Sequence, residues 1–302
     1  MNSQKTILVG IDFSPSSACA LREASRIANA EKLPLICFHV LDKEVLKQFI
    51  AQDNLHDVEV LDLASAKLNT FIQDTIGTAH QIETIVKIGN SFALTLDLIE
   101  ENKVKTLVLG SQGLTSFEGL EIGTLAARCV RKAPVEVLLV RSCQGEPFKS
   151  IGVCVDFSET SIQAAHRAAE IAFQDGAALK LIHAYRDPAH SKTDIGWLKL
   201  VIPMKDHGEI REDLQKQLQE LGQTISEKYH LKVTTEVKCS HSISGVLYKT
   251  LKEMEADLVV FGTRGLTGIK KLLIGSTAEN LIHTTPCSAL IIKPKGFTFS
   301  LN

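Results

Sequence analysis

The sequence contains few aromatic residues, little net charge and no long apolar run. Aromatic residues make up 5% of the 302 positions, so aliphatic side chains must fill the core. The formal net charge of −2 gives no electrostatic basis for binding nucleic acid or an anionic membrane. No apolar stretch approaches the roughly 18 residues that a membrane-spanning helix needs. The first residues also lack a secretory pattern, so we expect a soluble cytoplasmic protein with neither nucleic acid nor membrane as a partner.

Cysteine occurs seven times but never in a CxxC pair. Most of these residues lie inside apolar runs, where cysteine behaves as a small hydrophobic residue. An odd count without paired spacing argues against a disulfide scaffold and against a zinc site. Hydrophobic residues (44%) and charged residues (23%) are balanced as in ordinary globular proteins. The length favours two domains, because a domain usually has about 100–200 residues.

The chain repeats itself in three places. ILVGIDFS at 7–14 is matched by IGVCVDFS at 151–158, LVLGSQGLT at 107–115 by VVFGTRGLT at 259–267, and IGT at 122–124 by IGS at 274–276. The second copy carries about eight extra residues, which we place in the polar segment 186–209. A short polar linker at 141–150 joins the copies. We therefore predict two domains, at residues 1–143 and 148–297.

Each copy alternates short apolar runs with segments of helical periodicity. Runs typical of buried strands lie at 6–11, 33–41, 81–88, 106–110 and 135–140 in the first copy, and at 151–155, 178–185, 232–238, 257–262 and 288–293 in the second. Ser14 followed by Pro15 is typical of a helix start, because serine caps a helix and proline suits its first turn. The alternation predicts two doubly wound α/β domains, each with a five-stranded parallel sheet. Ligands of such sheets bind beyond the carboxyl ends of the strands.

A glycine pattern follows the fourth predicted strand of each copy. It comprises Gly110, Gly113 and Gly123-Thr124 in the first copy, and Gly262, Gly265 and Gly275-Ser276 in the second. Glycine lets a backbone approach a phosphate closely, and the helix that follows offers unpaired N–H groups and a positive dipole end. The alternative is that these glycines only shape turns, and that Thr124 and Ser276 only cap helices.

The spacing Gly-x2-Gly-x9-Gly-[Ser/Thr] resembles the ATP-binding signature of the universal stress protein family, and both copies carry it intact. DFS at 12–14 and 156–158 and HVL at 39–41 also look like that family. The resemblance implies two adenine-nucleotide alpha-hydrolase-like domains in tandem, arranged as a pseudo-dimer. It also implies a stress-response protein that binds ATP, ADP or AMP, with Mg as an optional companion of the nucleotide.

The resemblance assigns roles to particular residues. Asp12 and Asp156 would contact the adenosine, Ile11 and Val155 would offer backbone near the base, and Val40 would form an apolar wall. Ribose and phosphates would be held by Gly110, Gly113, Gly123 and Thr124 in the first copy, and by Gly262, Gly265, Gly275, Ser276 and Thr277 in the second. The alternative for the two aspartates is local: each could end its strand and help to start the next helix.

The copies differ in charge around the predicted phosphate loop. Gln112 aligns with Arg264, and Glu118 aligns with Lys270. Because a triphosphate prefers cations, the second copy with Arg264 favours a polyphosphate. Two other changes could narrow or reshape the second pocket: Ser240 or His241 replaces Gly89, and Ala184 replaces Val40. We expect two sites of unequal affinity.

No catalytic motif is present: HExxH, GxSxG and GxxxxGK[ST] are all missing. We interpret His39 and His183 as satisfied, partly buried residues and predict a nucleotide-binding regulator that hydrolyses its ligand slowly at most. A second hypothesis is an interaction module whose pockets are vestigial or hold another small molecule. A third, an adenylate-forming or pyrophosphatase-type enzyme, is disfavoured because no serine-glycine-rich loop follows the first strand.

The fifth strand of each copy follows a proline and is expected at a sheet edge, at 135–140 and 288–293. Apolar edge strands pair readily with other strands. We therefore predict that the two copies pair within the molecule, and that two chains can associate further as a homodimer.

Overall fold

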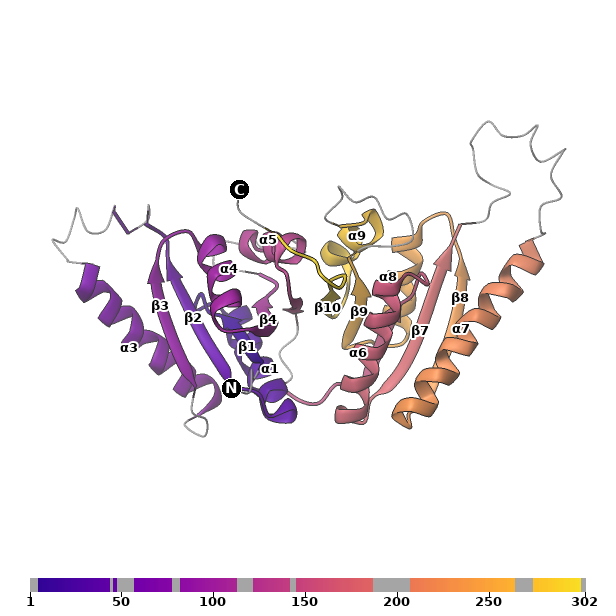
Figure 1. Cartoon of the computed structure of the whole chain (residues 1–302), viewed down its shortest axis with the longest axis horizontal. Coiled ribbons are helices and arrows are strands. Elements are labelled where there is room, and N and C mark those ends of the chain that lie inside the picture. Colours follow the sequence, from indigo (N-terminus) through magenta and orange to yellow (C-terminus); the bar gives the residue numbers. More distant parts are fainter. Residues whose placement is uncertain are drawn as a thin grey trace, which may run out of the picture. The chain divides into compact units, whose positions relative to one another are not determined.

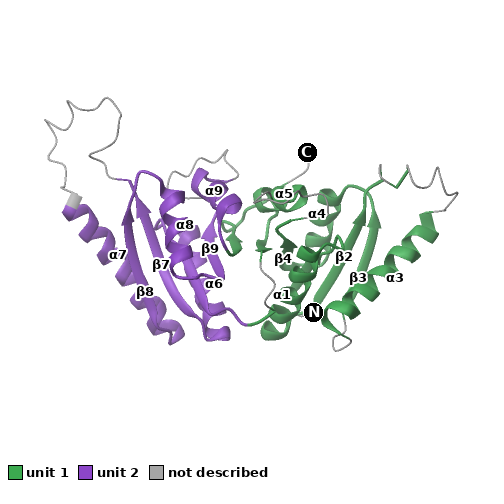
Figure 2. Ribbon diagram, turned by 180° about the vertical axis from the view of Figure 1, so that it is seen from behind, with its two compact units in different colours: residues 1–146, 287–302 green, residues 147–286 purple. Residues whose placement is uncertain are grey.

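The computed structural model describes residues 5–43, 46–47, 57–77, 82–112, 122–141, 145–186, 207–263 and 274–299 (Figure 1). The chain divides into two compact units, shown in different colours in Figure 2. Unit 1 comprises Met1–Glu146 and Cys287–Asn302, and unit 2 comprises Pro147–Pro286. The last strand of the second sequence repeat therefore belongs to unit 1.

Unit 1 is a sheet with the strand order β3-β2-β1-β4-β5-β10 and helices on both faces. Its elements are β1 (Thr6–Gly10), α1 (Pro15–Glu31), β2 (Leu35–Leu41), α3 (Asp57–Ile76), β3 (Glu83–Ile88), α4 (Ser91–Glu101), β4 (Val104–Gly110), α5 (Thr124–Lys132), β5 (Glu136–Val140) and β10 (Ser288–Ile292). Neighbouring strands run parallel, except that β10 lies antiparallel to β5, with Ala289 opposite Leu139. The predicted pairing of the two sequence repeats as whole domains within the molecule stays a prediction.

Unit 2 repeats the same plan with the strand order β9-β6-β7-β8, and all of its strand pairs are parallel. Its elements are β6 (Ser150–Cys154), α6 (Glu159–Asp175), β7 (Ala178–Tyr185), α7 (His207–Tyr229), β8 (Val233–Cys239), α8 (Ile243–Glu253), β9 (Leu258–Gly262) and α9 (Ser276–Thr284). The predicted doubly wound α/β class is confirmed. In both units the strand order reverses beside the first strand, at β1/β4 and at β6/β9, which is where such sheets bind ligands.

Aliphatic side chains fill the core, as the shortage of aromatic residues requires. Ile7, Leu8 and Val9 of β1 are fully buried, because strands of a parallel sheet are covered on both faces. In unit 1, α1 packs beside α3 and α4 packs beside α5; in unit 2 the corresponding pairs are α6 with α7 and α8 with α9. These helix pairs form the layers that flank each sheet in Figure 1. No helix of the described ranges is long and apolar enough to cross a bilayer.

Serine starts the first helix of each unit. The Ser14 side chain accepts a hydrogen bond from Ser17 N at 3.1 Å, and Pro15 occupies the first turn of α1. The Ser158 side chain caps α6 in the same way, accepting from Ser161 N at 3.2 Å. The predicted helix start at Ser14-Pro15 is confirmed. Both caps direct the amino end of the helix toward the strand-end turn in front of it.

Candidate functional site

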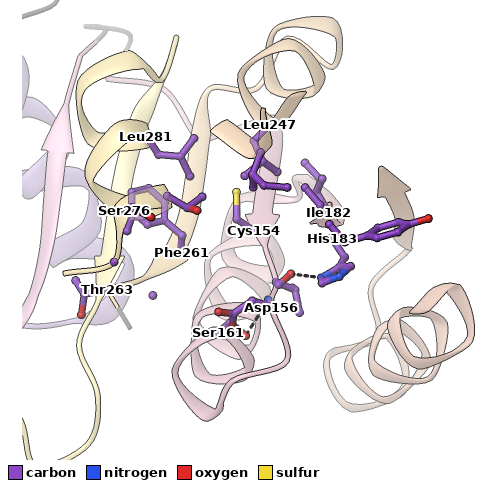
Figure 3. A pocket seen from close by; sticks show the side chains of 18 of the residues that line it. Cys154, Asp156, Ser161, Ile182, His183, Leu247, Phe261, Thr263, Ser276 and Leu281 are labelled. Atoms are coloured by element: carbon purple, nitrogen blue, oxygen red, sulfur yellow. Dashed lines mark hydrogen bonds between the residues drawn. The ribbon is translucent and has the colours of Figure 1, made fainter. Parts of the chain in front are cut away.

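In each unit a cavity lies at the carboxyl ends of the central strands. The cavity of unit 1 has a volume of about 500 Å³ and lies between the ends of β1, β2 and β4 and the start of α5. The cavity of unit 2 has a volume of about 420 Å³ and occupies the corresponding place (Figure 3). Both volumes are in the range of small-molecule sites, and both cavities lie where the strand order reverses.

Most of the residues predicted from the sequence line these cavities. Those of unit 1 are Ile11, Asp12, Val40, Gly110, Gly123 and Thr124. Those of unit 2 are Val155, Asp156, Gly262, Gly275, Ser276 and Thr277. Gly113, Arg264 and Gly265 lie outside the described residues, as do Glu118 and Lys270. Residues more than 110 positions apart in the chain, such as Ile11 and Thr124, therefore meet in the same cavity.

The aspartate after the first strand shapes a tight turn. In unit 1, Asp12 Oδ1 accepts hydrogen bonds from Ser14 N at 3.0 Å and Ser14 Oγ at 2.5 Å. In unit 2, Asp156 Oδ1 accepts from Ser158 N at 3.0 Å and Ser158 Oγ at 2.6 Å. The local role considered for these aspartates is therefore present in both units. Each aspartate also lines its cavity, so the turn places a carboxylate at the cavity wall.

A phenylalanine in the left-handed region follows each aspartate. Phe13 has φ 65° and Phe157 has φ 64°, conformations that cost a non-glycine residue about 1–2 kcal/mol. The Phe13 ring packs 4.6 Å from the His39 ring, and the Phe157 ring packs 4.8 Å from the His183 ring. This packing, together with the aspartate hydrogen bonds, holds the strained turn in both units.

The histidine of the second strand supports the same turn from the other side. His39 Nδ1 lies 2.7 Å from Ile11 O, and His183 Nδ1 lies 2.7 Å from Val155 O (Figure 3). A carbonyl oxygen only accepts, so Nδ1 carries the proton in both rings. Burial lowers the pKa of each imidazole, which favours the neutral form. Both histidines are thus hydrogen-bonded to the backbone and at least partly buried, as predicted from the sequence.

Gly110 and Gly262 have a packing reason to be glycine. A Cβ at Gly110 would lie 2.5 Å from Ser16 Oγ and 2.8 Å from the Ser16 backbone carbon. A Cβ at Gly262 would lie 2.8 Å from Thr160 Cγ2. The end of the fourth strand thus contacts the first turn of α1 or α6 without an intervening side chain. Close packing against α1 or α6 accounts for these two glycines, whatever the cavity holds, and neither has the positive φ angle that favours glycine in a turn.

Gly123 and Gly275 differ from that pair because the space beside Gly275 is open. A Cβ at Gly275 would find no atom closer than Thr263 O at 3.7 Å, and both glycines have ordinary negative φ angles. Each is the N-cap of its helix, and no side chain of the described ranges caps α5 or α9 by a hydrogen bond. The first turn of each helix therefore presents its N–H groups and positive dipole end to the cavity, which is an arrangement that suits an anion.

Backbone hydrogen bonds tie each helix start to the end of the preceding strand. Gly123 N donates to Ser111 O at 3.0 Å, and Gly275 N donates to Thr263 O at 2.8 Å. These bonds use the N–H of the glycine itself and leave those of the following residues directed at the cavity. The distance between strand end and helix start is thereby set by the backbone in both units.

Thr263 adds a polar group that the sequence did not single out. Its side chain is 1% exposed and lines the unit 2 cavity, and its Oγ1 has no hydrogen-bond partner among the described residues. A buried hydroxyl without a partner costs about 1–3 kcal/mol, so a ligand atom that pairs with it would be stabilising. Its place directly after Gly262 was the only signal that could have identified it.

Other wall residues come from helices outside any motif. Leu247 of α8 and Leu281 of α9 make the unit 2 cavity apolar on one side (Figure 3). Ser91 at the start of α4 lines the unit 1 cavity. Within the described parts of the chain, no three or more His, Cys, Asp and Glu side chains gather in a way that could hold a metal ion. The cavities thus combine an apolar wall, at least one carboxylate and a helix start whose amides suit an anion.

Comparison with known proteins agrees with this architecture. A universal stress protein of Mycobacterium tuberculosis is 25% identical over 314 residues, covering 97% of this chain and 97% of that protein. Universal stress protein A homolog 1 of Coxiella burnetii is 32% identical over 151 residues, covering 48% of this chain and 96% of that protein. The crystal structure of a universal stress protein from Archaeoglobus fulgidus has the same fold at 16% identity, with a TM-score of 0.65 over 95% of this chain and 98% of that one.

The family model of the universal stress protein family matches this chain twice, over residues 4–141 and 147–293. Both matches contain the strand-end aspartate, the glycine pattern and the uncapped helix start described above. The chain therefore belongs to the universal stress protein family and carries its domain twice in tandem.

Proposed function

We propose that each unit binds an adenine nucleotide in its cavity and that the protein acts as a nucleotide-responsive regulator in stress survival. The observation that supports this most directly is the start of α5 and of α9, where the N-cap is a glycine and the helix amides face the cavity. A phosphate placed there would accept from these amides and from the hydroxyls of Thr124 or Ser276. The nucleoside would lie along the apolar wall, near Asp12 or Asp156.

The protein acts in this proposal as a binder, with hydrolysis slow at most. The histidines beside the cavity donate Nδ1–H to backbone carbonyls and are held in that role by the turn. The aspartates are engaged in the strand-end turn through Oδ1. Because these hydrogen bonds belong to the strand-end turn, we assign both types of residue to shaping the cavity wall. Magnesium, if bound, would be brought by the phosphates.

A second candidate is an interaction module whose cavities hold another small molecule or none. The packing role of Gly110 and Gly262 favours it, because much of the sequence signature is explained by packing against α1 and α6. The two candidates differ in their response to nucleotide. A ligand at about 100 times its Kd stabilises the folded state by roughly 2.7 kcal/mol, which a thermal melt detects.

The decisive variants replace the N-cap glycines. Asp is a preferred N-cap residue, so Gly123→Asp and Gly275→Asp should cap α5 and α9, leave the fold intact and repel a phosphate from the same amides. We expect ATP, ADP or AMP to raise the melting temperature of the wild type, each single variant to keep part of the shift, and the double variant to lose it. A wild-type melting temperature that no nucleotide changes, with or without magnesium, would favour the interaction module. Native mass spectrometry of the purified protein would identify any ligand carried through purification.

A further inference from the structure

The two cavities can be compared residue by residue, because His39 and His183 make the same hydrogen bond in both units. Each histidine donates to the carbonyl that precedes the strand-end aspartate, at 2.7 Å in both cases. Three residues further on, at the carboxyl end of the second strand, unit 1 has Asp42 and unit 2 has Arg186. Both residues line their cavities. A carboxylate in one unit thus stands where the other has a guanidinium.

This reversal changes the charge of the cavity wall. Among the described lining residues, unit 1 has two carboxylates, Asp12 and Asp42, and no lysine or arginine. The described lining of unit 2 has one carboxylate, Asp156, and one guanidinium, Arg186. The described lining of unit 1 therefore has one carboxylate more and one guanidinium fewer than that of unit 2.

Several described residues that would hold the phosphate and the sugar are alike in the two units. Serine, glycine and hydroxyl residues correspond between the units: Ser17 with Ser161, Gly110 with Gly262, Gly123 with Gly275, and Thr124 with Ser276. Figure 3 shows Ser276 and Thr263 on one side of the unit 2 cavity and Ile182 and His183 on the other. Arg186 follows His183 by three residues and lines the same cavity as Ser276 at the helix start. The charge difference therefore belongs to the cavity wall.

A charge on the cavity wall also attracts or repels a bound phosphate that it does not touch. The Debye length is about 10 Å at 0.1 M salt, and water-poor cavity walls screen less than bulk solvent. Replacing a negative charge by a positive one changes the attraction of an anion by twice the effect of either charge alone. The effect grows with the number of phosphate charges and is close to zero for an uncharged nucleoside.

Resting on the function proposed above, we propose that Asp42 and Arg186 divide the two sites by ligand charge. Unit 2, with Arg186, takes nucleoside di- and triphosphates. Unit 1, with Asp42, takes the nucleoside or its monophosphate. One chain then responds to two forms of the same metabolite, and its state reflects how far the nucleotide is phosphorylated.

The test isolates one site at a time in the full-length chain. Gly123→Asp blocks phosphate at unit 1 and leaves ATP binding at unit 2 to be measured, while Gly275→Asp does the reverse. Calorimetric titrations with ATP, without magnesium, give the ATP affinity of each site, and titrations with adenosine, which neither substitution excludes, serve as the control for cavity shape. We expect ATP to bind more tightly at unit 2 than at unit 1, by roughly tenfold at 0.1 M salt.

Exchanging the charges should reverse that preference. Arg186→Asp in the Gly123→Asp chain should weaken ATP about tenfold, and Asp42→Arg in the Gly275→Asp chain should strengthen it about tenfold. Adenosine should change by about twofold or less in both. The neutral changes Arg186→Gln and Asp42→Asn should give about half the logarithmic effect. The melting temperature shows whether a full charge reversal disturbs folding. If it does, the two neutral variants test the proposal instead.

The two failures are distinguishable. If ATP and adenosine bind but the ATP affinity of each site does not respond to these substitutions, the assignment to Asp42 and Arg186 is overturned and nucleotide binding stands. If neither ligand binds the wild-type chain, the proposed function itself fails. An effect of equal size on ATP and adenosine would indicate a loss of cavity shape and would also overturn the charge assignment.

Discussion

The cavities of units 1 and 2 share one scaffold and differ in their walls. In both, the aspartate hydrogen bonds, the serine cap and the histidine donor have nearly the same lengths. Neighbouring wall residues differ as pairs between the two units. Unit 1 has Gly10 beside Leu109, and unit 2 has Cys154 beside Phe261 at the corresponding positions. A Cβ at Gly10 would lie 2.6 Å from Leu109 Cδ2, so a side chain there requires different neighbours. Residues that shape the backbone were kept, and residues that face the cavity changed together.

The largest expected effect concerns the close approach of the fourth strand to the first helix. Gly110→Ala forces its Cβ against the Ser16 backbone, whereas Gly262→Ala meets mainly the Thr160 side chain. We expect the free energy of unfolding to fall by about 3 kcal/mol for Gly110→Ala and about 1–2 kcal/mol for Gly262→Ala. Denaturant unfolding followed by circular dichroism would measure both.

Gly275→Ala is the matched control for that pair, because its Cβ enters open space. It should cost less than about 1 kcal/mol, the ordinary penalty for alanine at an N-cap. Losses of the same size at Gly110, Gly262 and Gly275 would contradict the packing role of the first two.

The second largest expected effect concerns the hydrogen bonds of the strand-end turn. Asp12→Ala or Asp156→Ala removes the acceptor of two hydrogen bonds and should lower the free energy of unfolding by about 1–2 kcal/mol. Asp12→Asn and Asp156→Asn keep an oxygen acceptor and should lose much less. Thermal melts without ligand would separate the two cases. Equal losses for alanine and asparagine would mean that the charge, and not the turn, is what the fold requires.

Cys154 offers a site-specific report on the unit 2 cavity, because unit 1 has glycine at that place. We expect ATP to slow the alkylation of Cys154 by iodoacetamide about fivefold, equivalent to about 1 kcal/mol. Cys239 is exposed and outside the cavity, so its rate serves as the control. Peptide mass spectrometry after timed labelling would measure both rates. Equal slowing at the two cysteines, or none at Cys154, would contradict ligand occupancy of unit 2.

The smallest effect is a pH dependence shared by the two histidines. Burial lowers the pKa of His39 and His183 below the ordinary value of 6.5 in the folded state. Between the lowered value and 6.5 the unfolded chain binds more protons, so stability is complete above this window and falls as pH drops through it. We expect a smaller decrease than the aspartate variants show. Melts between pH 7.5 and pH 5.5 on the wild type and on His39→Asn with His183→Asn would detect it, and an unchanged slope in the variants would refute it.

Much of the fold was predictable because its signals are local. The duplicated strand-end sequence around Asp12 and Asp156, the Ser14-Pro15 helix start and the apolar strand runs all depend on residues a few positions apart. The predicted site residues that fall in the described ranges do line the cavities. Whether they bind nucleotide stays a proposal. From the sequence, Gly110 and Gly123 are both interpreted as phosphate-loop glycines. In the structure Gly110 packs closely against Ser16, whereas Gly123 is an N-cap without a capping side chain.

The sequence by itself determined the duplication, the order of strands and helices, and the residues at the ends of the central strands, because hydrophobic periodicity and turn chemistry act over short distances. Tertiary structure alone decided that β10 belongs to unit 1, that Thr263 Oγ1 lacks a partner in the described chain, and that Asp42 and Arg186 face equivalent cavities. Each of these depends on the distance between segments that lie far apart along the chain. Packing sets such distances, and no local pattern encodes them.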